Sequence, residues 1–470
     1  MRSSWRSKCL VKAVAGIGVA AAAPAVLGAG FALQENSASG LGNAYAGGAA
    51  VAEDASSVWF NPAGMARLRQ AETVAAIHLI TPSARFRNDD SVAAFNQPLG
   101  GEGGNAGGLH VVPNAYVVFP YSNELAFGLG INAPFGLTTE YDDGWIGRYH
   151  GLKSEVKTIN VQPSLSWRFS KEFSVGLGVN FQWIDADFTS STNYSAALAQ
   201  GAQQAAAAGQ IPASLVPQIV GATGGLDSFT RVKGDDTAWG WNLGMLYELS
   251  PDTRFGAHYR SSIKYTVSGD VDFDNPALPS TLPPALAPVV GAIANNVNRV
   301  LADGGVTSRI ELPPIANVSF FHRLNDRWDV MADIQWTGWS TIKDLTFVRN
   351  EGPILQSTPE NFEDAWRFSL GANYRLNDQW MLRGGVAYDE TPVIDVDRTP
   401  RLPDENRTWL AIGAQYKFSP QLVFDAGFSY IWISDASIDT NAGSTAQNGL
   451  LRGKYDSDVT IFSVQAMYRF

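Results

Sequence analysis

The sequence predicts an all-β fold, a 14-stranded antiparallel transmembrane β-barrel that holds an N-terminal hatch, or plug, in its lumen. Three features predict it: stretches of alternating hydrophobicity, short turns that alternate with long loops, and a small-residue segment before the first strand. Only 17% of the 470 residues are charged, against roughly 25% in a soluble domain, so much of the surface is expected to face lipid. Beyond the N-terminus no apolar run reaches the roughly 20 residues of a spanning helix, which excludes a helical bundle.

The N-terminus has the three parts of a secretory signal peptide. A basic start is followed by a short apolar stretch and then by small residues, so we expect residues 1–28 to be cleaved. The only cysteine, Cys9, leaves with this segment, which removes disulfides, iron–sulfur clusters and thiol nucleophiles from consideration. The net charge of -11 becomes more negative on cleavage, and no nucleic-acid partner is therefore expected.

Most of the remaining sequence alternates with a period of two. In Ile159–Phe169, apolar side chains occupy one face, and Asn, Gln, Ser and Arg occupy the other. Each stretch has about ten residues, enough for a tilted strand to cross a bilayer, and many end in the aromatic residues of an interfacial girdle. A soluble sandwich would instead show a polar face rich in Lys and Glu. The same pattern occurs in Phe173–Trp183, Trp366–Tyr374, Leu410–Phe418, Leu422–Trp432 and Phe462–Phe470.

The connections favour an outer-membrane barrel. Very short turns such as Ser170-Lys171 alternate with long segments. Outer-membrane barrels share this asymmetry, with their turns in the periplasm and their loops outside the cell. The count gives about 14 strands within residues 71–470, the predicted barrel domain. The long loops are expected at 87–109, 132–154, 189–236, 270–306, 343–362, 391–406 and 435–456.

Two of these loops, 189–236 and 270–306, are expected to be partly helical. The first is Ala/Gln-rich between Ser195 and Val220, and the second carries spaced Leu, Val and Ile between Pro276 and Leu301. Both place apolar surface outside the cell. Either they pack on each other as a lid, or they capture an apolar ligand.

Residues 29–70 do not alternate, and the lumen is the obvious place for such a Gly/Ala/Ser-rich segment. This predicted hatch resembles that of the FadL-type long-chain fatty-acid transporter family of outer-membrane proteins, which has an aromatic-hydrocarbon branch. The resemblance covers nearly the whole chain after the signal peptide. It rests on Ala29-Gly30-Phe31, Ser39-Gly40-Leu41-Gly42, Ala44-Tyr45, Glu53-Asp54 and Asn61-Pro62-Ala63, then on Gly240-Trp241-Asn242, Tyr259-Arg260-Ser261, Asp364-Ala365, Pro403-Asp404 and the terminal Phe470.

The resemblance implies a third strand with a kink that opens the barrel wall sideways. That strand ends in Asn132-Ala133-Pro134-Phe135-Gly136, and proline cannot donate to a ladder while glycine weakens it. The alternative is that Pro134 only marks the end of the strand. Phe31 matches the phenylalanine of the family's hatch near the ligand, either as a movable gate or as a packing anchor. The expected ligand and gate residues are Phe31, Asn61, Pro62, Ala63, Asn132, Pro134, Phe135 and Gly136.

The resemblance further implies passive transport of hydrophobic molecules, most of all long-chain fatty acids. Arg168, Arg367 and Arg375 are the candidates to bind a carboxylate, although such arginines equally serve to balance the hatch acids Glu53 and Asp54. Glu363 stands where the fatty-acid transporters look basic, which strengthens the alternative of neutral alkanes or aromatics.

No enzyme is expected, because the five histidines are scattered without partners at telling spacings. A general porin or an outer-membrane lipase fits the hatch and the apolar loops less well. The acidic stretch 389–397 is expected to be a solvated loop, and we expect no metal and no cofactor. The expected partners of a monomer in the outer membrane are its hydrophobic ligands, lipid and lipopolysaccharide, and the barrel-assembly machinery at Phe470.

Overall fold

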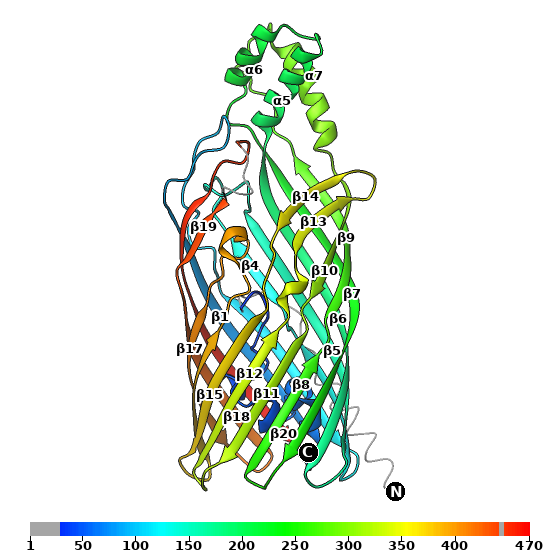
Figure 1. Ribbon diagram of the computed structural model, residues 1–470, viewed down its shortest axis with the longest axis vertical. Helices are drawn as coiled ribbons and strands as arrows, with labels where there is room; N and C mark the ends of the chain where they lie inside the picture. Colours follow the sequence, from blue (N-terminus) through cyan, green and yellow to red (C-terminus); the bar gives the residue numbers. More distant parts are fainter. Residues whose placement is uncertain (1–28, 441–445) are drawn as a thin grey trace.

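The computed structural model describes residues 29–440 and 446–470, so the predicted signal peptide lies outside the described residues. The strands form one sheet of 20 segments, in which six pairs of consecutive segments each continue one another, so the wall has 14 members. β1 pairs with β20 from Glu72↔Arg469 to Asn88↔Gly453, which closes the sheet on itself. The predicted 14-stranded antiparallel barrel is confirmed (Figure 1).

Eight members of the wall are single strands: β1 (Glu72–Asn88), β2 (His110–Pro120), β5 (Lys153–Arg168), β6 (Phe173–Asn193), β7 (Asp227–Glu248), β16 (Trp380–Asp389), β17 (Arg407–Lys417) and β20 (Arg452–Arg469). The other six are divided in two: β3 (Leu125–Asn132) with β4 (Gly136–Glu140), β8 (Thr253–Arg260) with β9 (Ile263–Asp274), β10 (Gly304–Leu312) with β11 (Ile315–Arg323), β12 (Trp328–Thr337) with β13 (Asp344–Arg349), β14 (Ile354–Pro359) with β15 (Ala365–Arg375), and β18 (Leu422–Ile433) with β19 (Ala436–Asp439).

Outward aromatic side chains mark two levels on the barrel. On the neighbouring strands β12 and β15, Trp328 faces Tyr374 at one level and Trp336 faces Trp366 at the other. Eight residues separate the levels on each strand, which at about 3.3 Å per residue matches the roughly 25 Å apolar band of an outer-membrane barrel. The second pair therefore marks the outer boundary of the apolar band. Within the described residues, no helix has both the length and the hydropathy to span a membrane.

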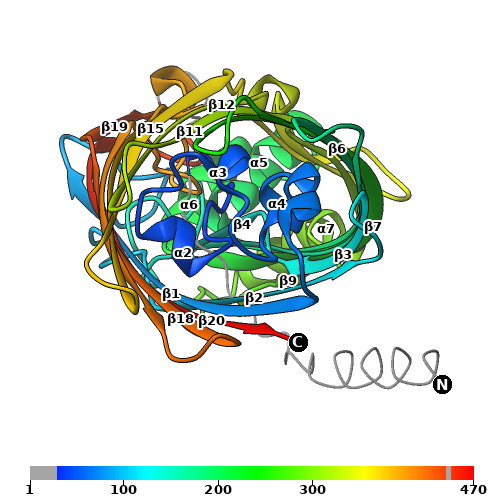
Figure 2. The same ribbon diagram turned by 90° about the horizontal axis from the view of Figure 1, so that it is seen from below.

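Residues 29–70 lie inside the ring of strands (Figure 2). They form α2 (Ala38–Leu41), α3 (Gly48–Val51), α4 (Ser57–Phe60) and η1 (Pro62–Arg67), linked by coil. Inward-facing glycines let this hatch touch the wall: a Cβ on Gly256 would lie 2.0 Å from the carbonyl oxygen of Ala49, and one on Gly385 would lie 2.3 Å from the backbone of Asn43. The glycines on the polar face of the strands are thus contact points for the plug.

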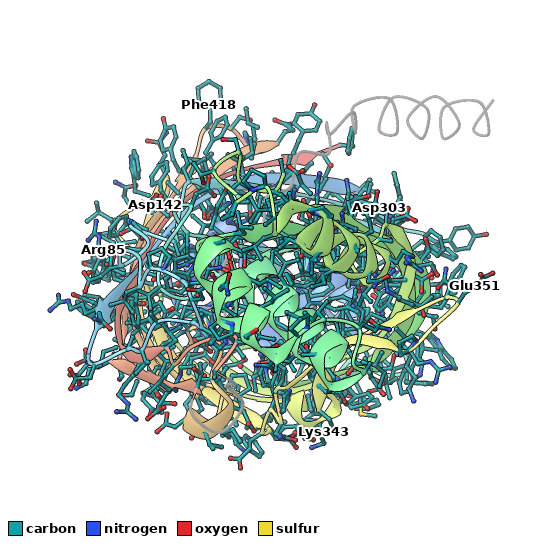
Figure 3. All side chains as sticks on the ribbon, turned by 90° about the horizontal axis from the view of Figure 1, so that it is seen from above. Arg85, Asp142, Asp303, Lys343, Glu351 and Phe418 are labelled. Atoms are coloured by element: carbon teal, nitrogen blue, oxygen red, sulfur yellow. The ribbon has the colours of Figure 1, made fainter. Side chains whose placement is uncertain are left out.

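The outer end carries a helical cap (Figures 1 and 3). It contains α5 (Tyr194–Ala207), α6 (Val216–Ala222) with η2 (Ala213–Leu215), and α7 (Ala287–Val300). α5 and α7 pack through Leu198, Val290 and Ile293, and the Tyr194 hydroxyl donates to Asn298 at 2.7 Å. The remaining short helices are η3 (Trp339–Thr341) and η4 (Asp395–Asp397).

Several strands continue past the ends expected from their alternation. β7 begins at Asp227 inside the predicted 189–236 loop, and β13 and β14 form a hairpin within the predicted 343–362 loop. Above the apolar band the outer face of a strand turns polar, as Arg231, Lys233 and Asp235 show on β7. The contrast between the faces disappears there, so a periodicity argument ends too early.

Candidate ligand cavity and transport path

The lumen above the hatch contains a cavity of about 850 Å³. Its size falls within the roughly 300–1,000 Å³ of small-molecule sites, and its inner wall is mostly apolar. The wall is contributed by β4, β5, β6, β9, β10 and β13 and by the loops before β15 and β17. Its apolar side chains are Phe31, Leu137, Val156, Phe188, Ile310, Ile342, Leu345, Phe362 and Leu402.

The inner end of the cavity is closed by Phe31 of the hatch. The Phe31 ring lies 4.9 Å from that of Trp339 and 6.0 Å from that of Phe135, both in edge-to-face arrangements. Gly30 has a φ of +60°, and a Cβ there would lie 2.6 Å from the Trp339 ring, so glycine is required beside it. The Gly30 N–H donates to Asp404 at 2.8 Å, which anchors the start of the described chain.

The third member of the wall is interrupted at the sequence expected to kink. β3 ends at Asn132 and β4 begins at Gly136, so Pro134 does not end the strand but divides it. β2 pairs with β3 only as far as Ala115↔Ile131, whereas β4 pairs with β5 alone among the described strands. The wall therefore lacks a hydrogen-bonded ladder between β4 and the first part of β2.

The hatch binds the edges of this interruption. Ala32 forms an antiparallel bridge with Phe135, in which the Leu33 N–H donates to the carbonyl of Pro134 at 2.8 Å and the Gly136 N–H donates to that of Phe31 at 2.9 Å. The Asn132 side-chain amide also donates to Asn36 at 2.6 Å. The Phe31 segment of the hatch and the interruption of the wall are therefore joined by hydrogen bonds.

Two ionisable side chains are buried in the cavity wall, Glu360 and Arg401. Both lie in loops, before β15 and β17 respectively. Burial lowers the pKa of Arg401 to about 10, so it is still cationic at neutral pH. Burial raises the pKa of Glu360 to about 8, although attraction to Arg401 opposes the rise. At pH 7 the cavity therefore presents a cation beside a largely neutral acid.

Arg401 is held by neutral groups. Its guanidinium donates to the Ser154 hydroxyl at 3.0 Å and to the Lys153 carbonyl at 3.3 Å, and it lies 5.4 Å from the centre of the Phe188 ring. Among the described residues no ion pair within 4.0 Å involves it. A buried cation in this state is suited to bind a carboxylate.

The arginines expected from the sequence lie elsewhere. Arg168 pairs with Glu248 at 3.1 Å, and Arg375 pairs with Asp329 at 2.6 Å, both near the short turns. Arg367 donates to the carbonyl of Ala44 at 2.9 Å in the hatch. None of the three lines the large cavity, so their assignment to carboxylate binding stays a prediction.

Another arginine of the wall, Arg383, agrees with the alternative interpretation that wall arginines balance the hatch acids. Arg383 bridges Glu53 of the hatch at 2.9 Å and Asp425 of β18 at 3.1 Å. Glu363 is exposed and its backbone N–H donates to Pro392, so its charge does not face the cavity. Asn61 caps η1 and donates to the carbonyls of Ala49 at 2.7 Å and Met245 at 2.8 Å. These contacts place Asn61, Pro62 and Ala63 on the side of the hatch that faces the short turns.

Sequence reasoning missed Arg401, Glu360 and Trp339. The 391–406 segment was expected to be an outer loop, but it folds inward, held by ion pairs of buried Arg398 with Glu405 and of Arg407 with Asp404. Alternation carries no information about loops that re-enter a lumen.

The barrel is closed and holds an internal plug, with an apolar cavity above the plug and an interruption of the wall beside it. These features define a membrane channel for hydrophobic molecules. A family model described as "Outer membrane protein transport protein (OMPP1/FadL/TodX)" matches residues 19–470, and the chain belongs to this outer-membrane family. Members of the family are transport channels and not enzymes.

Curated relatives are similar over nearly their whole length. The chain is 30% identical over 450 residues to the long-chain fatty acid transport protein of Escherichia coli O6:H1, covering 94% of this chain and 96% of the relative. It is 31% identical over 417 residues to outer membrane protein P1 of Haemophilus influenzae, covering 86% of each chain.

Solved structures share the fold. A FadL homologue of Pseudomonas aeruginosa has a TM-score of 0.80 at 25% identity, with 94% of this chain and 99% of that chain covered. The toluene transporter TodX of P. putida has a TM-score of 0.63 at 19% identity, with 88% and 94% covered, and supports the fold alone.

Proposed function

We propose that this protein carries hydrophobic molecules, above all long-chain fatty acids, passively across the outer membrane. The observation that carries the proposal is the apolar 850 Å³ cavity with Arg401 buried in its wall and the hatch residue Phe31 at its inner end. Each buried CH₂ contributes about 0.8 kcal/mol, so an acyl chain is held by the wall and its carboxylate by the guanidinium. The fatty-acid transport protein of E. coli, similar over most of its length, supports this substrate class.

Capture takes place outside the membrane in this proposal. A second hollow of about 750 Å³ lies between α5 and α7, and it is lined by Ile211, Val289, Val297, Val300 and Leu301 among others. Its apolar surface gives a hydrophobic molecule a first resting place. The two readings of these loops are compatible, since the helices pack on each other and leave a groove.

Release follows from the unit formed by the hatch and the kink. Moving Phe31 breaks its bridge to the Phe135 segment and opens the cavity toward the unpaired stretch between β2 and β4. That stretch begins at Asn114, level with Ala76 on β1, and lies within the apolar band. A molecule that leaves sideways there enters lipid without crossing water.

Neutral alkanes or aromatics are the second candidate. Apart from Arg401, Glu360 and the hydroxyls of Tyr265 and Ser308, the inner wall offers contacts that a hydrocarbon satisfies equally well. Lipid, lipopolysaccharide and the barrel-assembly machinery at Phe470 remain proposed partners.

We expect cells that express the protein, and lack their own fatty-acid channel, to take up radiolabelled oleate faster than cells with an empty vector. Replacing Leu137 by Trp adds a bulky ring inside the cavity and should lower this uptake severalfold, whereas Leu137→Met keeps the volume and should preserve it. The proposed function is rejected if cells with the protein take up neither oleate nor radiolabelled hexadecane faster than cells without it.

The pH dependence of binding follows from Glu360. It is neutral below its pKa of about 8 and negative above it, while the ligand carboxylate is ionised throughout. As the pH rises from about 7 to 9, Glu360 should gain the charge that pairs with Arg401 and repels the ligand, so oleate binding should weaken severalfold. Displacement of a fluorescent fatty acid from purified protein measures this. Glu360→Gln should flatten the profile, and an unchanged profile in that variant would assign the titration to another group.

A further inference from the structure

The wall has a second interruption, on the side of β10. β10 pairs with β13 only at Val306↔Arg349 and Thr307↔Val348, although it pairs with β9 along its whole length. Outward of these pairs the Asn350 N–H donates to the carbonyl of Gly305 at 2.9 Å, and inward of them only the Thr341 hydroxyl reaches the β10 backbone, by donating to the carbonyl of Glu311 at 3.0 Å. No other hydrogen bond between described residues joins the backbone of 308–312 to the facing segment 339–347.

The cavity opens through this interruption. Five consecutive residues of β10, Thr307 to Glu311, line it, although successive side chains of a strand point to opposite faces. The outward side chains Lys264 and Thr266 of β9 line it as well as the inward Tyr265 between them. A cavity that contacts both faces of a strand must reach its free edge. This lining points to a passage between the lumen and the outside past the free edge of β10.

This opening lies outside the apolar band. Trp336, which marks the outer boundary, is paired with Ala316, and the free edge begins four residues further out, at Leu312. Its rim is charged, with exposed Lys264, Arg309 and Lys343 beside Glu311 and Asp344. Lys264 is 77% exposed and lies 3.4 Å from Glu311. Figure 3 shows Lys343 at the periphery of the barrel, away from the capping helices.

The capture groove ends close to the same strand. Val300 and Leu301, at the end of α7, line the groove and directly precede β10. The carbonyl of Val300 accepts from Arg349 at 3.1 Å, which ties the end of the groove to the end of β13. The groove therefore ends beside the paired outer end of β10, next to the free edge at 308–312.

We propose that the free edge of β10 is a side port, through which hydrophobic molecules enter the cavity from the outer surface. The proposal rests on the proposed transport function and adds a direction to it. Admission takes place at the port, outside the apolar band, and release takes place at the β2–β4 interruption, inside it. Cations on the rim attract the carboxylate of an arriving fatty acid, while the tail meets Ile310, Ile342 and Leu345 behind them.

The port is tested by blocking it with a bulky thiol reagent. Cys9 is the only cysteine of the sequence and lies in the predicted signal peptide, so Arg309→Cys and Thr307→Cys each give one reactive site at the port. The control is Gly221→Cys on α6, where the added side chain meets nothing within 4 Å. Whole cells are treated with polyethylene-glycol maleimide, and uptake of radiolabelled oleate is compared before and after treatment of the same variant.

We expect treatment to lower oleate uptake severalfold in both port variants and to leave the Gly221→Cys variant unchanged. Oleate bound at equilibrium by the purified, modified protein should persist, because the port is obstructed and the cavity is not. Uptake that continues unaltered in the labelled port variants, or that falls equally in the control, overturns the port while transport itself stands. If neither the untreated variants nor the original protein takes up oleate, the proposed transport function is wrong instead.

Discussion

Replacing Gly385 by Val is expected to displace the hatch around Asn43 and make the barrel leak ions. A Cβ at this position would lie 2.3 Å from the backbone carbon and oxygen of Asn43, inside any permitted contact. Both partners are backbone, so no side-chain rotation relieves the clash, and overpacking of this kind costs about 1–3 kcal/mol. The hatch segment around Asn43 must move away, and with it the hydrogen bond from Arg367 to Ala44 is lost.

The measurement is single-channel conductance in planar bilayers, which we expect to rise severalfold, since a displaced hatch admits water to the polar lumen of such a barrel. The neighbouring glycine supplies the matched control. A Cβ on Gly384 meets nothing within 4 Å, so Gly384→Val should conduct like the original protein. Equal conductance of the two variants would show that the hatch does not depend on close contact at Asn43.

Alternation was sufficient to predict the wall because one face of each strand meets lipid. The period of Ile159–Phe169 and Leu422–Trp432 gives β5 and β18 directly, and the small residues of 29–70 indicate a plug. Inward-facing glycines, such as Gly256, are the points at which the plug touches the wall. Their role requires knowing which surface lies opposite, and the sequence of one strand does not contain that.

The site was predicted only in part for a related reason. Phe31, Pro134 and Phe135 come together because two short segments, each marked by glycine or proline, form a bridge between Ala32 and Phe135, far apart in the sequence. Arg401 was missed because loops have no period, and the residues that bury it, such as Phe188 and Ser154, are far away in the chain. The free edge of β10 was missed because it results from the absence of pairing with β13, and only the strand register shows where pairing stops.

Arg401 decides between fatty acids and neutral hydrocarbons, and Arg401→Met should separate them. Methionine keeps an apolar side chain of similar length but removes the charge, so oleate loses its carboxylate partner. Hydrogen bonds to charged groups contribute about 1.5–3 kcal/mol, which corresponds to an oleate affinity about 10- to 100-fold weaker. Binding of toluene or hexadecane, which have no carboxylate, should change little. Both affinities are measured by displacement of a fluorescent fatty acid from purified protein.

Two features of the cavity make this substitution a clean test. Glu360 does not become an unpaired buried charge, because without Arg401 its pKa rises further above about 8 and the acid stays neutral at pH 7. Arg401→Lys retains a cation on a flexible stem and should recover part of the oleate affinity, which a merely structural arginine would not show. If the Met variant binds oleate as tightly as the original protein, the acyl chain alone provides the affinity. The cavity then selects for length and apolarity, and the carboxylate of a fatty acid stays at the charged rim of β10.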